Sequence, residues 1–174
     1  MAPWVNFQPW QQTPAPLGAG SFPTSCKHLF TFPCLQYLMP ERYEIIDHTA
    51  DIAIRTSGSN LNQAFENAAY ALFDTMCDAS TVRPLKVKKV EIESEDMEQL
   101  LVDWLSRLLF ICDVDDMLYS EFEVTITGTT LKATMKGEKL DADRHQLKTD
   151  IKAITYHMLE VNTDTNTVQV LFDI

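Results

Sequence analysis

Residues 87–109 have the sequence VKKVEIESEDMEQLLVDWLSRLL, in which a strand pattern changes into a helix pattern. Apolar and charged residues alternate at first, which predicts a strand over Val87–Ser94. Asp96 followed by Gln99 is typical of a helix start, because both side chains can satisfy free backbone N–H groups. The leucines that follow recur at helical spacing. This stretch therefore indicates a fold that mixes strands and helices.

The same two patterns extend to either side. Asn60 followed by Gln63 starts a second predicted helix, with apolar residues at helical spacing as far as Met76. Predicted strands lie at Tyr43–Ile46, Ile52–Thr56, Phe122–Ile126, Leu131–Met135, Ile151–Val161 and Val168–Asp173. Two helices and several antiparallel strands predict an α+β fold, with antiparallel β-sheets and the two helices packed on them.

The chain changes character near Pro40. Residues 1–40 hold seven of the eight prolines, no Asp or Glu, and Lys27 as their one charged residue. Such a composition predicts disorder. A targeting extension and an over-long gene model with Met39 as the true start are alternatives. We expect an N-terminal extension at residues 1–40 and a folded domain at residues 41–174.

The charge of the chain restricts its partners. The formal net charge is −11 and the pI is about 4.6. Direct binding to nucleic acid is not expected, because gripping a phosphate backbone needs clustered Lys and Arg. An acidic surface suits a basic protein partner and concentrates divalent cations. The sequence shows neither a bilayer-spanning apolar run nor a signal peptide, so we expect a cytoplasmic protein unless the extension is a targeting peptide.

The four cysteines do not have metal-binding spacing. Cys26 and Cys34 lie in the extension, and Cys77 and Cys112 lie near the ends of the predicted helices. The last two are most simply interpreted as buried thiols.

Three short segments could carry chemistry. Asp47-His48-Thr49-Ala50-Asp51 places two carboxylates and an imidazole between two strands, where they could bind a hard cation or only cap a turn. The chain end Asp173-Ile174 offers a side-chain carboxylate and an α-carboxylate, either packed or frayed. In Ile151–His157, Lys152 shares a predicted strand face with Ile154, Tyr156 and Met158. Its ammonium could form a salt bridge with the carboxylates, or it could be an exposed charge that keeps an edge strand from pairing with another chain.

Taken together, these segments resemble the archease family. Its members carry an Asp-His-Thr-Ala-Asp segment, a later Ile-Lys-Ala-(Ile/Val)-Thr-Tyr-His segment and a final Asp-Ile or Asp-Val. Here these are Asp47–Asp51, Ile151–His157 and Asp173-Ile174, and further matches are Gly137-Glu138, Asp141 and His145. The similarity covers Arg42 to Ile174. One departure is Ala53, where many members have Gly.

The resemblance implies a function and a site. Archeases hold a divalent cation, taken as calcium, with manganese or magnesium as alternatives. The implied ligands are Asp51, Asp173 and the α-carboxylate of Ile174, and Asp47, His48 and Lys152 have supporting roles. The implied partner is the manganese- and GTP-dependent tRNA-splicing RNA ligase, whose guanylylation and multiple turnover archease promotes. The protein is then an activator and not an enzyme.

Two other functions remain open at the level of sequence. One is a chaperone-like adaptor for RNA-modifying enzymes. The other is a metal-dependent hydrolase that uses Asp51 and Asp173 with His48 as a base. No Gly-rich phosphate loop or nucleophile motif supports the hydrolase.

Overall fold

The computed structural model describes residues 42–46 and 51–174 of the chain. The strands are β1 (Tyr43–Ile46), β2 (Asp51–Ser57), β3 (Lys86–Glu93), β4 (Met117–Thr127), β5 (Thr130–Lys139), β6 (Ala153–Asn162) and β7 (Thr167–Asp173). The helices are α1 (Leu61–Met76) and α2 (Met97–Asp115), with a 3-10 turn at Ala79–Thr81. The expected extension at residues 1–40 lies outside the described residues.

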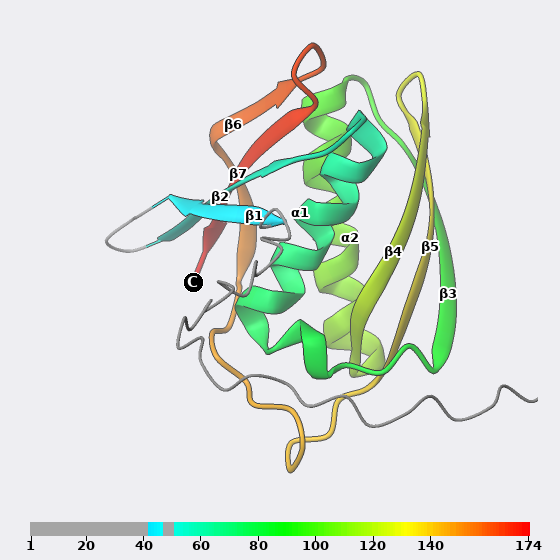
Figure 1. Ribbon diagram of the computed structural model, residues 1–174, viewed down its shortest axis with the longest axis vertical. Coiled ribbons are helices and arrows are strands. Elements are labelled where there is room, and N and C mark those ends of the chain that lie inside the picture. Colours follow the sequence, from blue (N-terminus) through cyan, green and yellow to red (C-terminus); the bar gives the residue numbers. More distant parts are fainter. Residues whose placement is uncertain (1–41, 47–50) are drawn as a thin grey trace, which may run out of the picture. The chain divides into compact units, whose positions relative to one another are not determined.

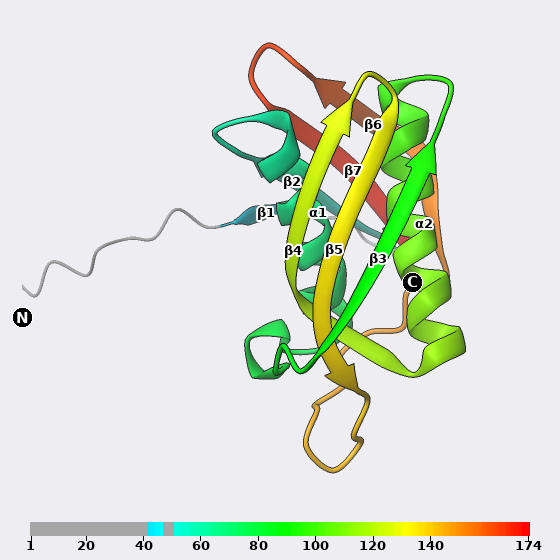
Figure 2. The ribbon, with the colours of Figure 1, turned by 90° about the vertical axis from the view of Figure 1, so that its right-hand side faces the viewer.

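The elements form three layers. One sheet has the order β1-β2-β7-β6 and the other has the order β3-β5-β4, and every neighbouring pair of strands is antiparallel. The two helices lie between the sheets (Figure 1). Figure 2 shows the three-stranded sheet in front of them. The predicted α+β class and its antiparallel sheets are confirmed.

Both helices begin where the sequence predicts. The side chain of Asn60 accepts a hydrogen bond from Gln63 N at 2.9 Å, and that of Asp96 accepts one from Gln99 N at 2.8 Å. The side chain of Gln63 reaches back and accepts a hydrogen bond at 2.7 Å from the backbone N–H of Ser59, one residue before the N-cap Asn60.

Helix α1 is buried on more than the one face that its apolar spacing predicts. The predicted stripe included Phe65, Leu72 and Met76, and the structure also buries Ala64 and Phe73 completely. Phe73 points to the second sheet, where its ring stacks on Phe122 at 5.7 Å. A helix covered by a sheet on each side needs apolar residues around most of its circumference.

The edge strand β4 is protected by side chains of α1. Glu66 accepts a hydrogen bond from Val124 N at 2.8 Å, and Asn62 accepts one from Ile126 N at 3.1 Å. These are edge N–H groups with no strand beside them, since β4 is the last strand of its sheet. The helix therefore satisfies donors that would otherwise be open to another chain.

The strand β6 does not keep the predicted alternation. Its register with β7 is regular from Ala153 to Thr155 and resumes at Glu160. The four residues Tyr156–Leu159 lie opposite the single residue Val170, so the strand bulges there. The expectation that Lys152, Ile154, Tyr156 and Met158 share one face is therefore wrong, because the bulge resets the alternation and Lys152 precedes the strand.

A buried carboxylate holds the segment between β5 and β6. Glu138 is 5% exposed, accepts hydrogen bonds from Arg83 N at 2.6 Å and Arg83 Nε at 3.1 Å, and pairs with Arg144. The buried ring of His145 lies beside it, with Nε2 3.5 Å from Oε1. Burial alone would raise the pKa of Glu138, but the hydrogen bonds from Arg83 and Arg144 outweigh it and lower the pKa to about 2.

Candidate metal site

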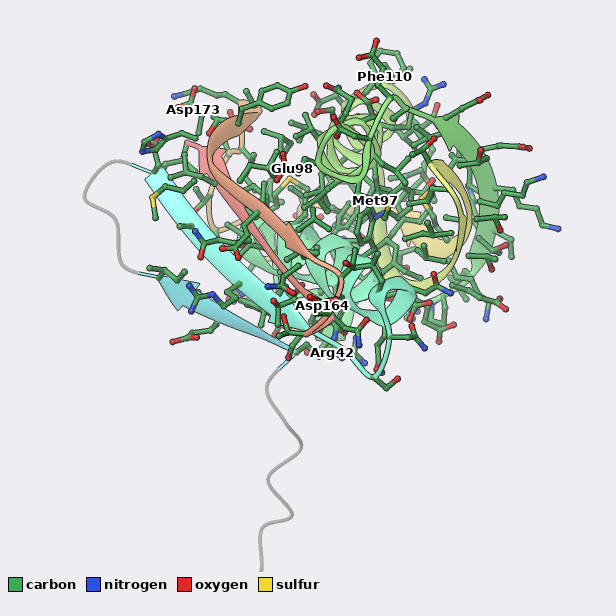
Figure 3. The ribbon with its side chains drawn as sticks, turned by 90° about the horizontal axis from the view of Figure 1, so that it is seen from above. Arg42, Met97, Glu98, Phe110, Asp164 and Asp173 are labelled. Carbon is green, nitrogen blue, oxygen red and sulfur yellow. The ribbon has the colours of Figure 1, made fainter. Side chains whose placement is uncertain are left out.

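The pairing of β2 with β7 brings together two of the predicted ligands. Asp51 opens β2 and Asp173 closes β7, and they are direct partners in the antiparallel register. Side chains of such partners lie on the same face of the sheet, with Cβ atoms about 5 Å apart. Both residues are half-buried. Figure 3 shows Asp173 at the edge of the molecule, where β7 ends.

The chain is ordered up to its final residue. The side chain of Ile174 packs against the hydrophobic core, on the opposite face from Asp173. Lys152 N donates a hydrogen bond to Asp173 O at 2.8 Å, which ties the start of β6 to the same place. Of the two interpretations of the chain end, the packed one is therefore correct. The side chain of Lys152 is exposed, and its ammonium forms no ion pair within residues 42–46 and 51–174.

The donors at this edge suit a hard divalent cation. Two carboxylates directly opposite each other repel, and a cation between them removes that repulsion. The hydroxyl oxygen of Thr155, on the same face two residues along from Ala153, is buried and has no hydrogen-bond partner among the described residues. The residues present therefore fit the cation that the resemblance implies.

The structure does not complete the ligand set. In the described part of the chain, no three side chains of His, Cys, Asp or Glu come together as a metal-binding group. The expected set has only two such side chains there, Asp51 and Asp173. Asp47 and His48 lie outside the described residues, so their supporting roles stay predictions.

The two described cysteines are ordinary thiols. Cys77 is buried at the end of α1 and Cys112 is half-buried in α2, and neither forms a disulfide. Burial raises the pKa of Cys77 to about 11 and that of Cys112 to about 12. Both stay protonated at neutral pH, so neither suits a nucleophile.

Sequence reasoning missed the polar contacts on the same face of the sheet. Arg55 and Gln169 are direct partners in the β2–β7 register, two rungs from Ala53 and four from Asp51. Arg55 Nη2 donates to Gln169 Oε1 at 2.8 Å, and Gln169 Nε2 donates to Met158 O at 3.0 Å. The signal in the sequence was a Gln within the otherwise apolar run Val168–Phe172. Its partners could not be found without the register and the bulge.

No helix in the described part of the chain is both long enough and apolar enough to span a membrane.

Comparison with known proteins shows the family of the chain. The model of the Archease protein family matches residues 43–174. Protein archease of Sulfurisphaera tokodaii is 43% identical over 128 residues, which cover 72% of this chain and 92% of the relative. Protein archease of Pyrococcus abyssi is 44% identical over 125 residues, which cover 70% and 88%. The solution structure of Methanobacterium thermoautotrophicum protein 1598 has a TM-score of 0.67 and 37% identity, covering 77% of this chain and 99% of that one. With the family match spanning both Asp51 and Asp173, the chain belongs to the archease family.

Proposed function

We propose that this protein is a non-catalytic, cation-binding activator of the GTP- and manganese-dependent tRNA-splicing RNA ligase. It promotes guanylylation of the ligase and allows the ligase to turn over repeatedly. The observation that carries the proposal is the direct register of Asp51 with Asp173 in a member of the archease family.

Asp51, Asp173 and the α-carboxylate of Ile174 are the proposed ligands of a divalent cation. Such a cation would neutralise the clustered carboxylates and offer a Lewis-acidic centre at the edge of the sheet. Calcium, manganese and magnesium all accept oxygen ligands of this kind. Lys152, whose backbone N–H bonds to Asp173 O and whose side chain is exposed, has the supporting role in this proposal.

The electrostatics favour a protein partner over RNA. A chain with a net charge of −11 is repelled by a phosphate backbone. The same charge attracts a basic protein surface, and RNA ligases must carry such surfaces to hold their own substrate. The activator therefore acts on RNA through the ligase.

The direct test is ligase guanylylation with labelled GTP, followed by multiple-turnover joining of tRNA halves. We expect substoichiometric amounts of this protein to raise both rates, and Asp51→Asn or Asp173→Asn to remove most of the increase. Asp164→Asn is the matched control, because Asp164 is an exposed acid in the turn at the other end of β7 (Figure 3). Full stimulation by the Asp51 and Asp173 variants would contradict the proposal.

The role of Ile174 has its own test. A short Gly-Ser extension after Ile174 converts the α-carboxylate into a neutral amide, which is a poorer partner for a hard dication. The side chain of Ile174 stays in the core, so we expect an unchanged fold. We expect weaker cation binding by calorimetric titration with manganese or calcium chloride, whereas the same extension at the N-terminus has no effect. Equal affinity in both proteins would remove the α-carboxylate from the site.

A chaperone-like adaptor and a metal-dependent hydrolase are the competing functions. The hydrolase would cleave phosphoesters without any partner. The protonated thiols of Cys77 and Cys112 offer it no nucleophile. The adaptor would bind several RNA-modifying enzymes equally well. Assay of the purified protein on phosphoesters tests the first, and comparison of its affinity for the ligase and for other RNA-modifying enzymes tests the second.

A further inference from the structure

The bulge of β6 presents a surface that the cation site does not use. Within Tyr156–Leu159, the side chain of Leu159 packs against the core. The other three point outwards: Tyr156 is 57% exposed, Met158 is 39% exposed, and His157 is exposed. The bend of β6 is visible in Figure 1. An aromatic ring, an imidazole and a thioether thus stand together on an outer strand.

This surface is formed at a conformational cost. Met158 has a φ of 57°, in the left-handed region that favours glycine. A residue with a side chain costs about 1 kcal/mol or more in that region. Backbone strain of this kind persists only where the surroundings impose it, and it concentrates at functional positions.

The bulge is held from both sides. On the helix side, the Tyr156 hydroxyl donates to Gln99 Oε1 at 2.7 Å, and Gln99 Nε2 donates to Asp103 Oδ1 at 2.8 Å. On the sheet side, Met158 O accepts from the buried side chain of Gln169, which in turn accepts from Arg55. The bulge is therefore a fixed feature and its side chains are presented in one arrangement.

The bulge adjoins the proposed cation site along the same strand. Ala153, at the start of β6, is the register partner of Asp173. Tyr156 comes three residues later, which is a distance of about 10 Å along a strand. Asp173 lies on the sheet face away from the helices and Tyr156 reaches towards α2, so a partner that contacts both does so across the β6 edge of the sheet.

We propose that Tyr156, His157 and Met158 form a docking surface for the RNA ligase, and this rests on the function proposed above. The surroundings suit such a partner. Asp103 is bonded to Gln99, Glu98 precedes Gln99 in α2, and Glu160 follows the bulge in β6, whereas the nearby Arg55 is bonded to Gln169. With the net charge of −11, this acidic side complements a basic protein. Tyr and Met are enriched at protein interfaces, and Tyr is among the side chains that most often carry the binding energy there.

Met158→Gly is the most selective variant for the test. Glycine adopts a φ of 57° without strain, so the bulge keeps its shape and only a half-exposed side chain is lost. We expect a thermal midpoint that is equal to or higher than that of the wild type, together with at least a fivefold loss of affinity for the ligase. Instability is then excluded as the cause of the loss.

Tyr156 is tested with two variants. Tyr156→Ala removes the ring, and we expect at least a tenfold loss of affinity. Tyr156→Phe keeps the ring and removes only the hydrogen bond to Gln99, so we expect a loss smaller than that of Tyr156→Ala. The control is Phe110→Ala, which removes a ring that is 55% exposed on α2 and lies apart from Asp173 in Figure 3. We expect this control to bind like the wild type.

The binding experiment is calorimetry of the full chain with purified ligase, in the presence of manganese. Wild-type binding that is weakened by the Tyr156 and Met158 variants, but not by Phe110→Ala, supports the docking surface. If the wild type binds and all of these variants bind with the same affinity, the docking surface is overturned and the proposed function stays intact. Absence of wild-type binding overturns both.

Discussion

At the scale of single residues, Asp51 and Asp173 carry an electrostatic cost that a cation can remove. Like charges that are direct cross-strand partners destabilise a sheet by up to about 1 kcal/mol. In the absence of divalent cations, we therefore expect Asp51→Asn to leave the free energy of unfolding unchanged or to raise it by that amount. A cation at 100 times its dissociation constant stabilises the wild type by about 2.7 kcal/mol, and we expect the variant to lose that gain.

Thermal unfolding with and without calcium, manganese and magnesium measures both effects. Asp164→Asn serves again as the control and is expected to respond to cations like the wild type. An equal cation-induced rise of the midpoint in the Asp51 variant would mean that Asp51 is not a ligand of the cation.

Glu138 gives a prediction for acid stability. Its pKa in the folded state is about 2, below the ordinary value of 4.5. Its ionised form therefore stabilises the fold fully above about pH 4.5, and this contribution is lost as pH falls towards 2. Glu138→Gln leaves Arg83 and Arg144 without a carboxylate. We expect this change to lower the free energy of unfolding by about 1–3 kcal/mol at pH 7.

Urea unfolding at pH 7, 4 and 2.5 measures this contribution. We expect the difference in the free energy of unfolding between wild type and Glu138→Gln to be largest at pH 7 and smallest at pH 2.5. A difference that does not vary with pH would show that Glu138 acts through packing and not through its charge.

At the scale of secondary-structure elements, α1 has a second role as the cover of β4. Glu66→Ala removes the acceptor of Val124 N, and an unsatisfied buried donor costs about 1–3 kcal/mol. We expect a loss of stability in that range and faster hydrogen exchange at Val124 N–H. Glu66→Gln keeps an acceptor oxygen at the same place and is expected to preserve both. Unchanged exchange in Glu66→Ala would indicate that water replaces the carboxylate without cost.

The sequence predicted where helices and strands lie better than it predicted how they pack against one another. Capping residues are local signals, so both helix starts were found at Asn60 and Asp96. The bulge at Tyr156–Leu159 was missed because its cause lies in β7 and α2, through Gln169 and Gln99, far away in sequence. The burial of Phe73 was missed for a similar reason, since periodicity shows how apolar a helix face is but not that a second sheet covers it.

The same limit applies to the site. Asp51 and Asp173 were singled out by their positions and by family resemblance, whereas composition alone allowed each to be a turn or terminal residue. Only the register of β2 with β7 makes them neighbours, and register is a property of two distant segments. The contacts of Arg55 and Gln169 depend on that same register.

At the scale of the whole molecule, the described core belongs to the part that matches the archease family, residues 43–174. We therefore expect a chain that begins at Met39 to unfold within about 2 °C of the full chain, since 1 kcal/mol corresponds to roughly 4 °C for a domain of this size. Differential scanning calorimetry of the two proteins, with the ligase assay beside it, measures this. A lower midpoint or weaker stimulation would show that residues 1–38 contribute to the domain.

The pairing of β2 with β7 has a consequence for how the protein is made. The ribosome releases β2 early and β7 last, so a growing chain holds one half of the carboxylate pair long before the other half exists. Until β7 arrives, β2 has an unpaired edge and α1 lacks much of one covering sheet, which leaves the partial chain prone to aggregation. A chain that stops before Thr167 carries no Asp173 and cannot assemble the site. In the function proposed above, a fragment that lacks β7 therefore cannot act through this carboxylate pair.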